Sequence, residues 1–188
     1  MTFNGQNIGD SQVCIDLIAD KFNLNIYPEN ESDKAISKAF QSMIEDRSIN
    51  FLALERFAFS KFEEFQDLNS NIFPKFVRFM GGFIWGRIGK GMRKVSPFGK
   101  LSKEKLADKS FEILNSLSKF LDNKKFFFGD TLTLLDIVVF SYLTQIYFMS
   151  PDSSLIKKQA ETIENLKEHH SMIKEMVYPD WDDLLYKD

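Results

Sequence analysis

Apolar residues recur every three or four positions along most of the chain after residue 31, which is the spacing of one face of an α-helix. We predict a long helix from Ser32, a helix capped by Ser102 and a central, largely apolar helix from Leu134 to Met149. Two more helices are predicted over residues 153–163 and 165–177, with Pro179 stopping the second. The apolar positions of the first helix are Ile36, Phe40, Met43, Phe51, Leu54, Ala58 and Phe62, and those of the Ser102 helix are Leu106, Ile113, Leu117 and Leu121. The pattern predicts a mainly α fold.

The first 31 residues follow a different pattern. Two short apolar pieces flank Asn4-Gly5, which is typical of a β-hairpin with a type I′ turn. Asp10 or Ser11 is expected to cap a short helix after it. Residues 23–31 contain Pro28 and several polar side chains and are predicted to be a linker. The expected boundaries are therefore 1–22 for the hairpin and first helix, 23–31 for the linker and 32–188 for the helical domain.

A glycine-rich segment interrupts the helical pattern. Six of the nine glycines lie between Gly81 and Gly99, so a helix that begins at Pro74 is expected to be broken or loop-like there. The segment fits no phosphate-binding motif. In Gly89-Lys90-Gly91 a glycine follows the lysine where a P-loop has Ser or Thr, and no predicted strand precedes it as in a dinucleotide fold.

The same part of the chain is strongly basic. From Pro74 to Lys103 there are eight Lys or Arg residues, no Asp or Glu, and several interleaved aromatic residues. One interpretation is a contact surface for anionic lipid or an acidic partner. The other is a helix whose aromatic side chains face the core while its basic residues are solvated. The candidate contact residues of the first interpretation are Arg78, Arg87, Lys90, Arg93 and Lys94.

Composition and charge narrow the class of protein. Hydrophobic residues make up 44% of the chain and charged residues 27%, as in a soluble globular protein. The net charge of −3 does not favour a nucleic-acid partner. The single Cys14 cannot form an internal disulfide, and the first residues do not resemble a secretory signal, so we expect a cytoplasmic protein, with membrane association through the basic segment as an option.

Few residues suggest catalysis. His169 and His170 are adjacent and would point about 100° apart on a helix, so no metal site is predicted and both are expected at the surface. Thr133 and Asp136 have the spacing of a capping box, in which the hydroxyl accepts from the Asp136 N–H and the carboxylate accepts from the Thr133 N–H. This is predicted to be a structural site and not a catalytic acid.

The segment from Phe127 to Asp136 resembles the capping motif of glutathione S-transferase C-terminal domains. Asn165-Leu166 with Tyr178-Pro179-Asp180-Trp181-Asp182 is similar to the C-terminal signature of the failed axon connections, cadmium-responsive and metaxin-like group. Phe98 to Ser102 is similar to a further stretch of that group, with substitutions. The resemblance implies a helical bundle of the transferase C-terminal type, fronted by a hairpin and helix left from a thioredoxin-like domain.

The resemblance also bears on activity. Asp10 and Ser11 match the pair that grips the γ-glutamyl end of glutathione, the one cofactor that the resemblance implies. The half of the thioredoxin-like domain that carries the family's sulfur-activating residue precedes the hairpin at which this sequence starts, so no catalytic residue is expected in it. We therefore expect a non-catalytic binding or adaptor module, and as the alternative a glutathione transferase-like enzyme in a longer form. The expected partners are a protein or an anionic membrane surface, or a second copy joined through the hairpin edge.

Overall fold

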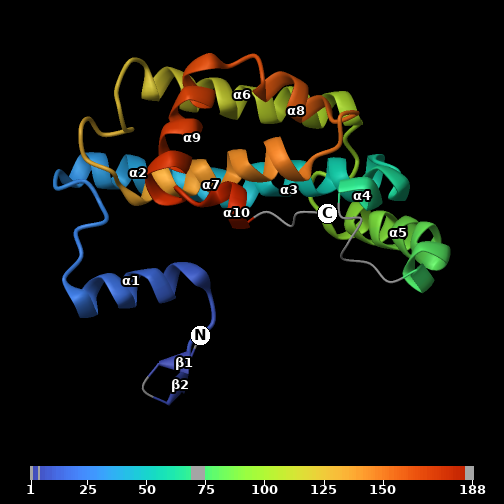
Figure 1. Cartoon of the computed structure of the whole chain (residues 1–188), viewed down its shortest axis with the longest axis horizontal. Helices are drawn as coiled ribbons and strands as arrows, with labels where there is room; N and C mark the ends of the chain where they lie inside the picture. Colours follow the sequence, from blue (N-terminus) through green and yellow to red (C-terminus); the bar gives the residue numbers. More distant parts are fainter. Residues whose placement is uncertain (1, 4, 69–74, 185–188) are drawn as a thin grey trace.

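The computed structural model of the chain describes residues 2–3, 5–68 and 75–184, and it is mainly helical (Figure 1). This confirms the predicted fold class. Two strands, ten α-helices and two π-helical segments are formed within the described residues. They are β1 (Thr2–Phe3), β2 (Gln6–Asn7), α1 (Ser11–Phe22), α2 (Glu31–Met43), η1 (Ile44–Ser48), α3 (Ile49–Leu54), η2 (Glu55–Phe59), α4 (Phe62–Leu68), α5 (Lys75–Val95), α6 (Lys103–Leu121), α7 (Leu134–Met149), α8 (Leu155–Ala160), α9 (Glu164–Val177) and α10 (Trp181–Leu184).

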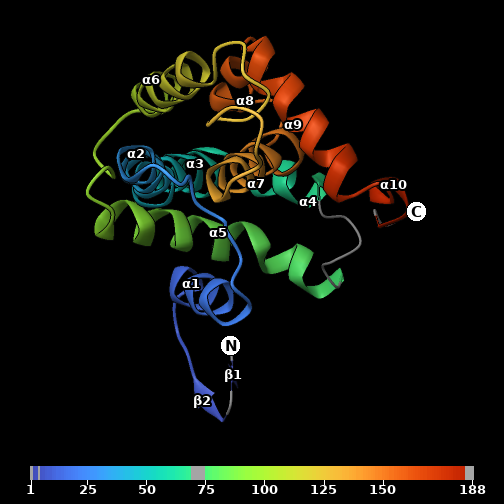
Figure 2. The ribbon, with the colours of Figure 1, turned by 90° about the vertical axis from the view of Figure 1, so that its left-hand side faces the viewer.

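Helix α7 occupies the centre of the bundle, as its nearly all-round apolar sequence predicts. It packs against α2, η1, α8 and α9, while α6 covers α8, α9 and α3 (Figure 2). Leu135, Val139, Leu143 and Ile146 of α7 are all fully buried. The predicted face of α6 is confirmed, since Leu106, Ile113, Leu117 and Leu121 all join this core.

The long helical run after the linker differs from its predicted stripe. It starts at Glu31, where Asn30 caps it, and passes through η1 and η2 before it ends at Ser60. In α2 and η1 the buried face lies one residue later than predicted, since Ser37, Gln41, Ile44 and Ser48 are buried and Ile36 is exposed. Further along the chain, Phe51, Leu54 and Phe62 are buried as predicted. Small polar residues on the inner face allow close packing of neighbouring helices. Each π-helical segment adds one residue to a turn and so changes the register of the face.

The expectation of a broken segment between Gly81 and Gly99 is wrong for most of its length. Helix α5 continues without interruption to Val95, and a turn follows over residues 97–100. Gly81 and Gly89 serve packing, because a Cβ at Gly81 would overlap the Phe62 ring and one at Gly89 would overlap the Phe57 carbonyl oxygen. The predicted start at Pro74 lies outside the described residues.

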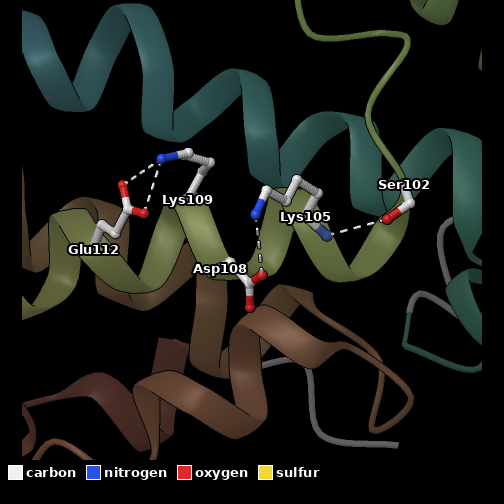
Figure 3. A network of polar contacts seen from close by, with 5 residues as sticks. All are labelled: Ser102, Lys105, Asp108, Lys109 and Glu112. Atoms are coloured by element: carbon white, nitrogen blue, oxygen red, sulfur yellow. Dashed lines mark hydrogen bonds and ion pairs between the residues drawn. The ribbon is translucent and has the colours of Figure 1, made fainter.

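Helix α6 begins as predicted, with the Ser102 hydroxyl oxygen accepting from the Lys105 N–H at 3.2 Å (Figure 3). Two ion pairs follow on its solvent side. Lys105 lies 4.0 Å from Asp108, and Lys109 lies 2.8 Å from Glu112 (Figure 3). Exposed pairs of this kind contribute little to stability, so the cap and the buried leucines fix this helix.

The hairpin and α1 stand apart from the bundle (Figure 1). The predicted hairpin is confirmed: Thr2 pairs with Asn7 and Phe3 with Gln6, and Gly5 has a positive φ, while Asn4 lies outside the described residues. Polar side chains join α1 to the linker and α2. The Gln12 amide donates to Asp16 and to the Tyr27 hydroxyl and accepts from Gln41. We propose the boundaries given above: 1–22 for the hairpin and first helix, 23–31 for the linker and 32–188 for the helical domain.

Candidate functional site

Helix α5 is held against the bundle by one buried aromatic residue. Trp85 is buried, and its indole N–H donates to the Ser60 carbonyl at 3.1 Å. Its ring centroid lies 4.7 Å from that of Phe57 and 4.5 Å from that of Phe65. Together with Gly81 and Gly89, which are also buried, Trp85 defines the inner side of the helix. These contacts fix the rotation of α5 about its own axis, and therefore which side chains meet solvent.

The opposite side of α5 combines apolar and basic side chains. Phe83 is 68% exposed, and Met80 and Ile84 are exposed beside it. Arg87, Lys90 and Lys94 follow on the same side of the helix and are exposed as well. The Arg87 guanidinium lies 5.9 Å from the centroid of the Phe83 ring. We call Met80, Phe83, Ile84, Arg87, Lys90 and Lys94 the α5 face.

The α5 face carries positive charge that no acidic side chain among the described residues neutralises. Among the described residues, none of its three basic side chains forms an ion pair. The sequence from residue 74 to 103 has no Asp or Glu. Each of the two interpretations of the basic segment therefore fits part of it. Trp85 faces the core, whereas Phe83 is exposed among solvated basic residues.

One of the five predicted contact residues, Arg93, does not contribute to this face. Arg93 has a structural role, because its Nε–H donates to the Gly99 carbonyl at 3.0 Å and its guanidinium lies 5.0 Å from the Phe59 ring centroid. The Arg78 side chain lies outside what the structure describes. Arg87, Lys90 and Lys94 remain as the basic part of the candidate surface.

The pair assigned to glutathione by resemblance lies at the start of α1. The Asp10 carboxylate caps the helix, with Oδ1 accepting from the Gln12 N–H at 2.8 Å and the Val13 N–H at 3.2 Å. Ser11 is the first residue of the helix, and both residues are exposed. In Figure 1, α1 lies below the α2 end of the bundle, whereas α5 lies below the α3 and α4 end. The contacts of Asp10 confirm the predicted helix cap. Binding of glutathione by Asp10 and Ser11 is a proposal.

The predicted capping box is present at the start of α7, with additional contacts. Asp136 Oδ2 accepts from the Thr133 N–H at 2.8 Å and from the Thr133 hydroxyl at 2.7 Å. Oδ1 accepts from the Phe127 N–H at 2.9 Å and lies 3.0 Å from His169 Nε2. The carboxylate is fully buried. It therefore connects α7 to the preceding loop and to α9, which supports a structural role.

The prediction of surface histidines is wrong. His169 and His170 are both buried, because α9 packs its inner side on α7. His169 contacts Asp136, while the His170 ring stacks on Phe140 with centroids 4.8 Å apart. Adjacent residues on a helix differ by about 100°, and this face is wide enough to bury both. Four polar residues lie around the two histidines in the sequence, so their burial was not predicted. These residues are Lys167, Glu168, Ser171 and Lys174.

One buried carboxylate was not predicted. Glu55 in η2 is buried and accepts from the Ser154 hydroxyl and the Leu155 N–H, both at 2.6 Å. It caps the start of α8 from another part of the chain. Spacing could not reveal it, because donor and acceptor are separated by about a hundred residues.

Comparisons with known proteins agree with this architecture. Residues 111–173 match the family described as "Glutathione S-transferase, C-terminal domain". The chain is 34% identical over 122 residues to "Failed axon connections" of Drosophila melanogaster, an alignment that covers 64% of this chain and 29% of the Drosophila protein. No solved structure gives a significant match. The predicted resemblance to glutathione S-transferases and to the failed axon connections group is thereby confirmed.

Proposed function

We propose that this chain, which carries a helical domain of the glutathione S-transferase C-terminal type, acts as a non-catalytic binding module that docks on anionic membrane surfaces through the α5 face. The observation that carries the proposal is the combination of exposed Phe83 with exposed Arg87, Lys90 and Lys94 on one side of a single helix. A helix of this kind can lie in the plane of a membrane interface. Its aromatic ring enters the boundary between headgroups and acyl chains while its basic side chains attract anionic headgroups.

The size of the two contributions suits reversible binding. Each basic residue near an anionic surface contributes about 1 kcal/mol, and burial of a phenylalanine side chain adds about 1.5–3 kcal/mol. Neither the charges nor the ring alone would hold the protein at a membrane. Among the described residues, no helix is long and apolar enough to cross a bilayer.

The residues with catalytic potential have structural contacts instead. Asp10 caps α1, His169 contacts Asp136, and His170 contacts Thr144 inside the helical bundle. These contacts support a binding role over a conjugating one.

Vesicle sedimentation tests the proposal. The chain should sediment with vesicles of phosphatidylserine and phosphatidylcholine at low salt, and much less with pure phosphatidylcholine or at high salt. Lys119 on α6 provides a matched control, since it is exposed but lies outside the α5 face. We expect Lys90→Gln and Phe83→Ser each to reduce sedimentation and Lys119→Gln to leave it unchanged. Absence of binding to anionic vesicles at any salt concentration would leave a protein partner as the alternative.

A second candidate is a glutathione transferase-like enzyme acting on electrophiles. One observation favours it: Asp10 and Ser11 are both exposed at the start of α1, where a glutathione molecule could reach them. Conjugation of glutathione to chlorodinitrobenzene by the purified chain distinguishes the candidates. We expect no conjugation above the uncatalysed rate, and measurable turnover would refute the non-catalytic role. Reduced turnover in Ser11→Ala would then place glutathione at α1.

A further inference from the structure

A groove of about 470 Å³ lies between α6 and α8. The two helices pack side by side on the side of the bundle away from α5 (Figures 1 and 2). We call this surface the α6–α8 groove. Its lining includes Glu104, Ala107, Asp108 and Phe111 of α6 and Leu155 and Lys158 of α8. The four α6 positions are spaced three or four residues along the helix, so one stripe of α6 forms a wall of the groove.

The floor of the α6–α8 groove is apolar. Ala107 is buried, whereas Phe111 and Leu155 are half-buried and come from opposite helices. Both half-buried side chains also pack against the hydrophobic core, so the fold fixes their positions. Part of each still meets solvent, and a partner that covers it would remove apolar surface from water. The floor can therefore hold a partner, but it does not select one.

The two walls of the groove carry opposite charges. Glu104 and Asp108 are exposed on the α6 wall, and Lys158 is exposed on the α8 wall. Within the part of the chain that the structure describes, neither Glu104 nor Lys158 forms an ion pair. Asp108 lies 4.0 Å from the exposed Lys105, at the outer limit of an ion pair (Figure 3). The charges of both walls are thus available to a partner.

The neighbouring charged residues are engaged elsewhere. Asp152 lies 2.9 Å from Lys157, and its pKa is lowered chiefly by Lys157 and least by Lys158. Lys103, which precedes Glu104, donates to a backbone carbonyl of the loop before α8 at 2.8 Å. Neither neighbour therefore neutralises the opposite charges of the walls.

We propose that two copies of this chain associate through their α6–α8 grooves, about a twofold axis that runs along the groove. Such an axis places the α6 wall of each copy against the α8 wall of the other. Glu104 and Asp108 then face Lys158 of the partner subunit, and this contact occurs twice in the dimer. Phe111 and Leu155 of the two copies cover one another between the charged walls. A surface whose two walls carry opposite charges is complementary to itself, as a twofold contact requires.

Other occupants fit the α6–α8 groove less well. The acidic α6 wall would repel an anionic membrane. A partner with one kind of charge would leave one wall facing like charge, which is costly at an interface. A second copy satisfies both walls. Because α5 lies on the other side of the bundle (Figure 1), this contact leaves the α5 face accessible, and the inference does not depend on membrane binding.

The two parts of the contact have different effects. Exposed ion pairs contribute little to affinity, so the apolar floor should supply most of it. The charges decide which walls meet and exclude the reverse orientation. Contacts smaller than a standard interface give weak, reversible association, so we expect a dimer Kd on the order of 10–100 μM.

Analytical ultracentrifugation of the full chain at low salt tests the proposal. The wild type should pass from monomer to dimer between about 1 and 500 μM. Lys158→Glu makes both walls acidic and should raise the dimer Kd about 10-fold or more. Lys119→Glu, at an exposed position of α6 outside the groove, is the matched control and should leave the Kd unchanged. A monomer at all concentrations, or a Lys158→Glu protein that dimerises like the wild type, would overturn the proposal.

A charge exchange between two variants identifies the walls that meet. Glu104→Lys combined with Asp108→Lys makes both walls basic, so this protein should also stay monomeric. Mixed in equal amounts with the Lys158→Glu protein, it should form a heterodimer, because acidic walls then face basic walls on both sides of the twofold axis. Failure of the two folded variants to associate would overturn the pairing of the walls. Far-UV circular dichroism checks the fold of the double variant, and Lys158→Glu alone remains decisive if that variant does not fold.

Discussion

His169 on α9 holds Asp136 at the start of α7: Nε2 of the histidine lies 3.0 Å from Oδ1 of the carboxylate, and both side chains are buried. The capping box therefore joins α7 to α9 as well as capping the start of α7. A buried carboxylate with four donors around it is stable only while all four remain, because each lost partner leaves part of a charge unsatisfied.

The first prediction concerns Asp136→Ala. The substitution strands the donors of Thr133, Phe127 and His169 inside the core. We expect it to lower the free energy of unfolding by about 3–5 kcal/mol, more than the loss of a simple helix cap. Urea unfolding measures the change. Asp130→Ala, at an exposed position in the preceding loop, should unfold at nearly the wild-type urea concentration; an equal effect of the two substitutions would contradict the account.

The second prediction compares two glycines of α5. A Cβ at Gly89 would overlap the Phe57 carbonyl oxygen, whereas the space around Gly86 is open. We expect Gly89→Ala to destabilise the protein by about 1–3 kcal/mol through overpacking. Gly86→Ala should instead stabilise it by about 0.5–1 kcal/mol, because alanine favours a helix. Thermal or urea unfolding of the two variants should therefore change in opposite directions, and a shared direction would exclude the close approach of α5 to η2.

The third prediction concerns Glu55. Its carboxylate accepts from the Ser154 hydroxyl and from the Leu155 N–H. Glu55→Gln replaces one acceptor oxygen by an NH₂ group, which faces another donor. We therefore expect the free energy of unfolding to fall by about 2–3 kcal/mol. Glu175→Gln, on the exposed side of α9, serves as the control. Wild-type stability of Glu55→Gln in urea would show that α8 does not depend on this cap.

The fourth prediction concerns pH. Burial lowers the pKa of His170 from 6.5 to about 4 in the folded protein, so between these values the unfolded chain binds more protons. Stability contributed by the neutral histidine is present above about pH 6.5 and is lost as pH falls toward 4. The slope from this one residue is at most about 1.4 kcal/mol per pH unit. Urea midpoints between pH 5 and 7 should fall more steeply for the wild type than for His170→Gln; identical slopes would contradict the prediction.

Sequence patterns predicted the parts of the fold in which local and tertiary preferences agree. The bounds of α7 and the Thr133–Asp136 box followed directly from apolar periodicity and capping residues. The Ser102 cap and the buried leucines of α6 did so too. In these segments the residues that favour a helix are also those that the core requires.

The errors arose where tertiary packing overrides local preference. The glycines of α5 suggested a break, but Gly81 and Gly89 are required by a neighbouring helix. The two histidines appeared polar enough for the surface, but Asp136 and Thr144 provide hydrogen bonds inside the bundle. The α5 face could be anticipated in its charge but not in its orientation, which depends on the contacts of Trp85.

Insertion of residue 84, beside Phe83 on the α5 face, into anionic vesicles tests the central proposal most directly. In a Cys14→Ser background, a single cysteine replaces the exposed Ile84 and carries an environment-sensitive NBD fluorophore, so that Phe83 is kept. A second variant carries the label at Lys158 on α8. We expect phosphatidylserine vesicles to shift the emission of the label at 84 to the blue and to leave the label at 158 unchanged, with the shift abolished by Arg87→Gln, Lys90→Gln and Lys94→Gln together. No shift at 84 with anionic vesicles, or an equal shift at 158, would contradict the assignment of the α5 face as a membrane-docking surface.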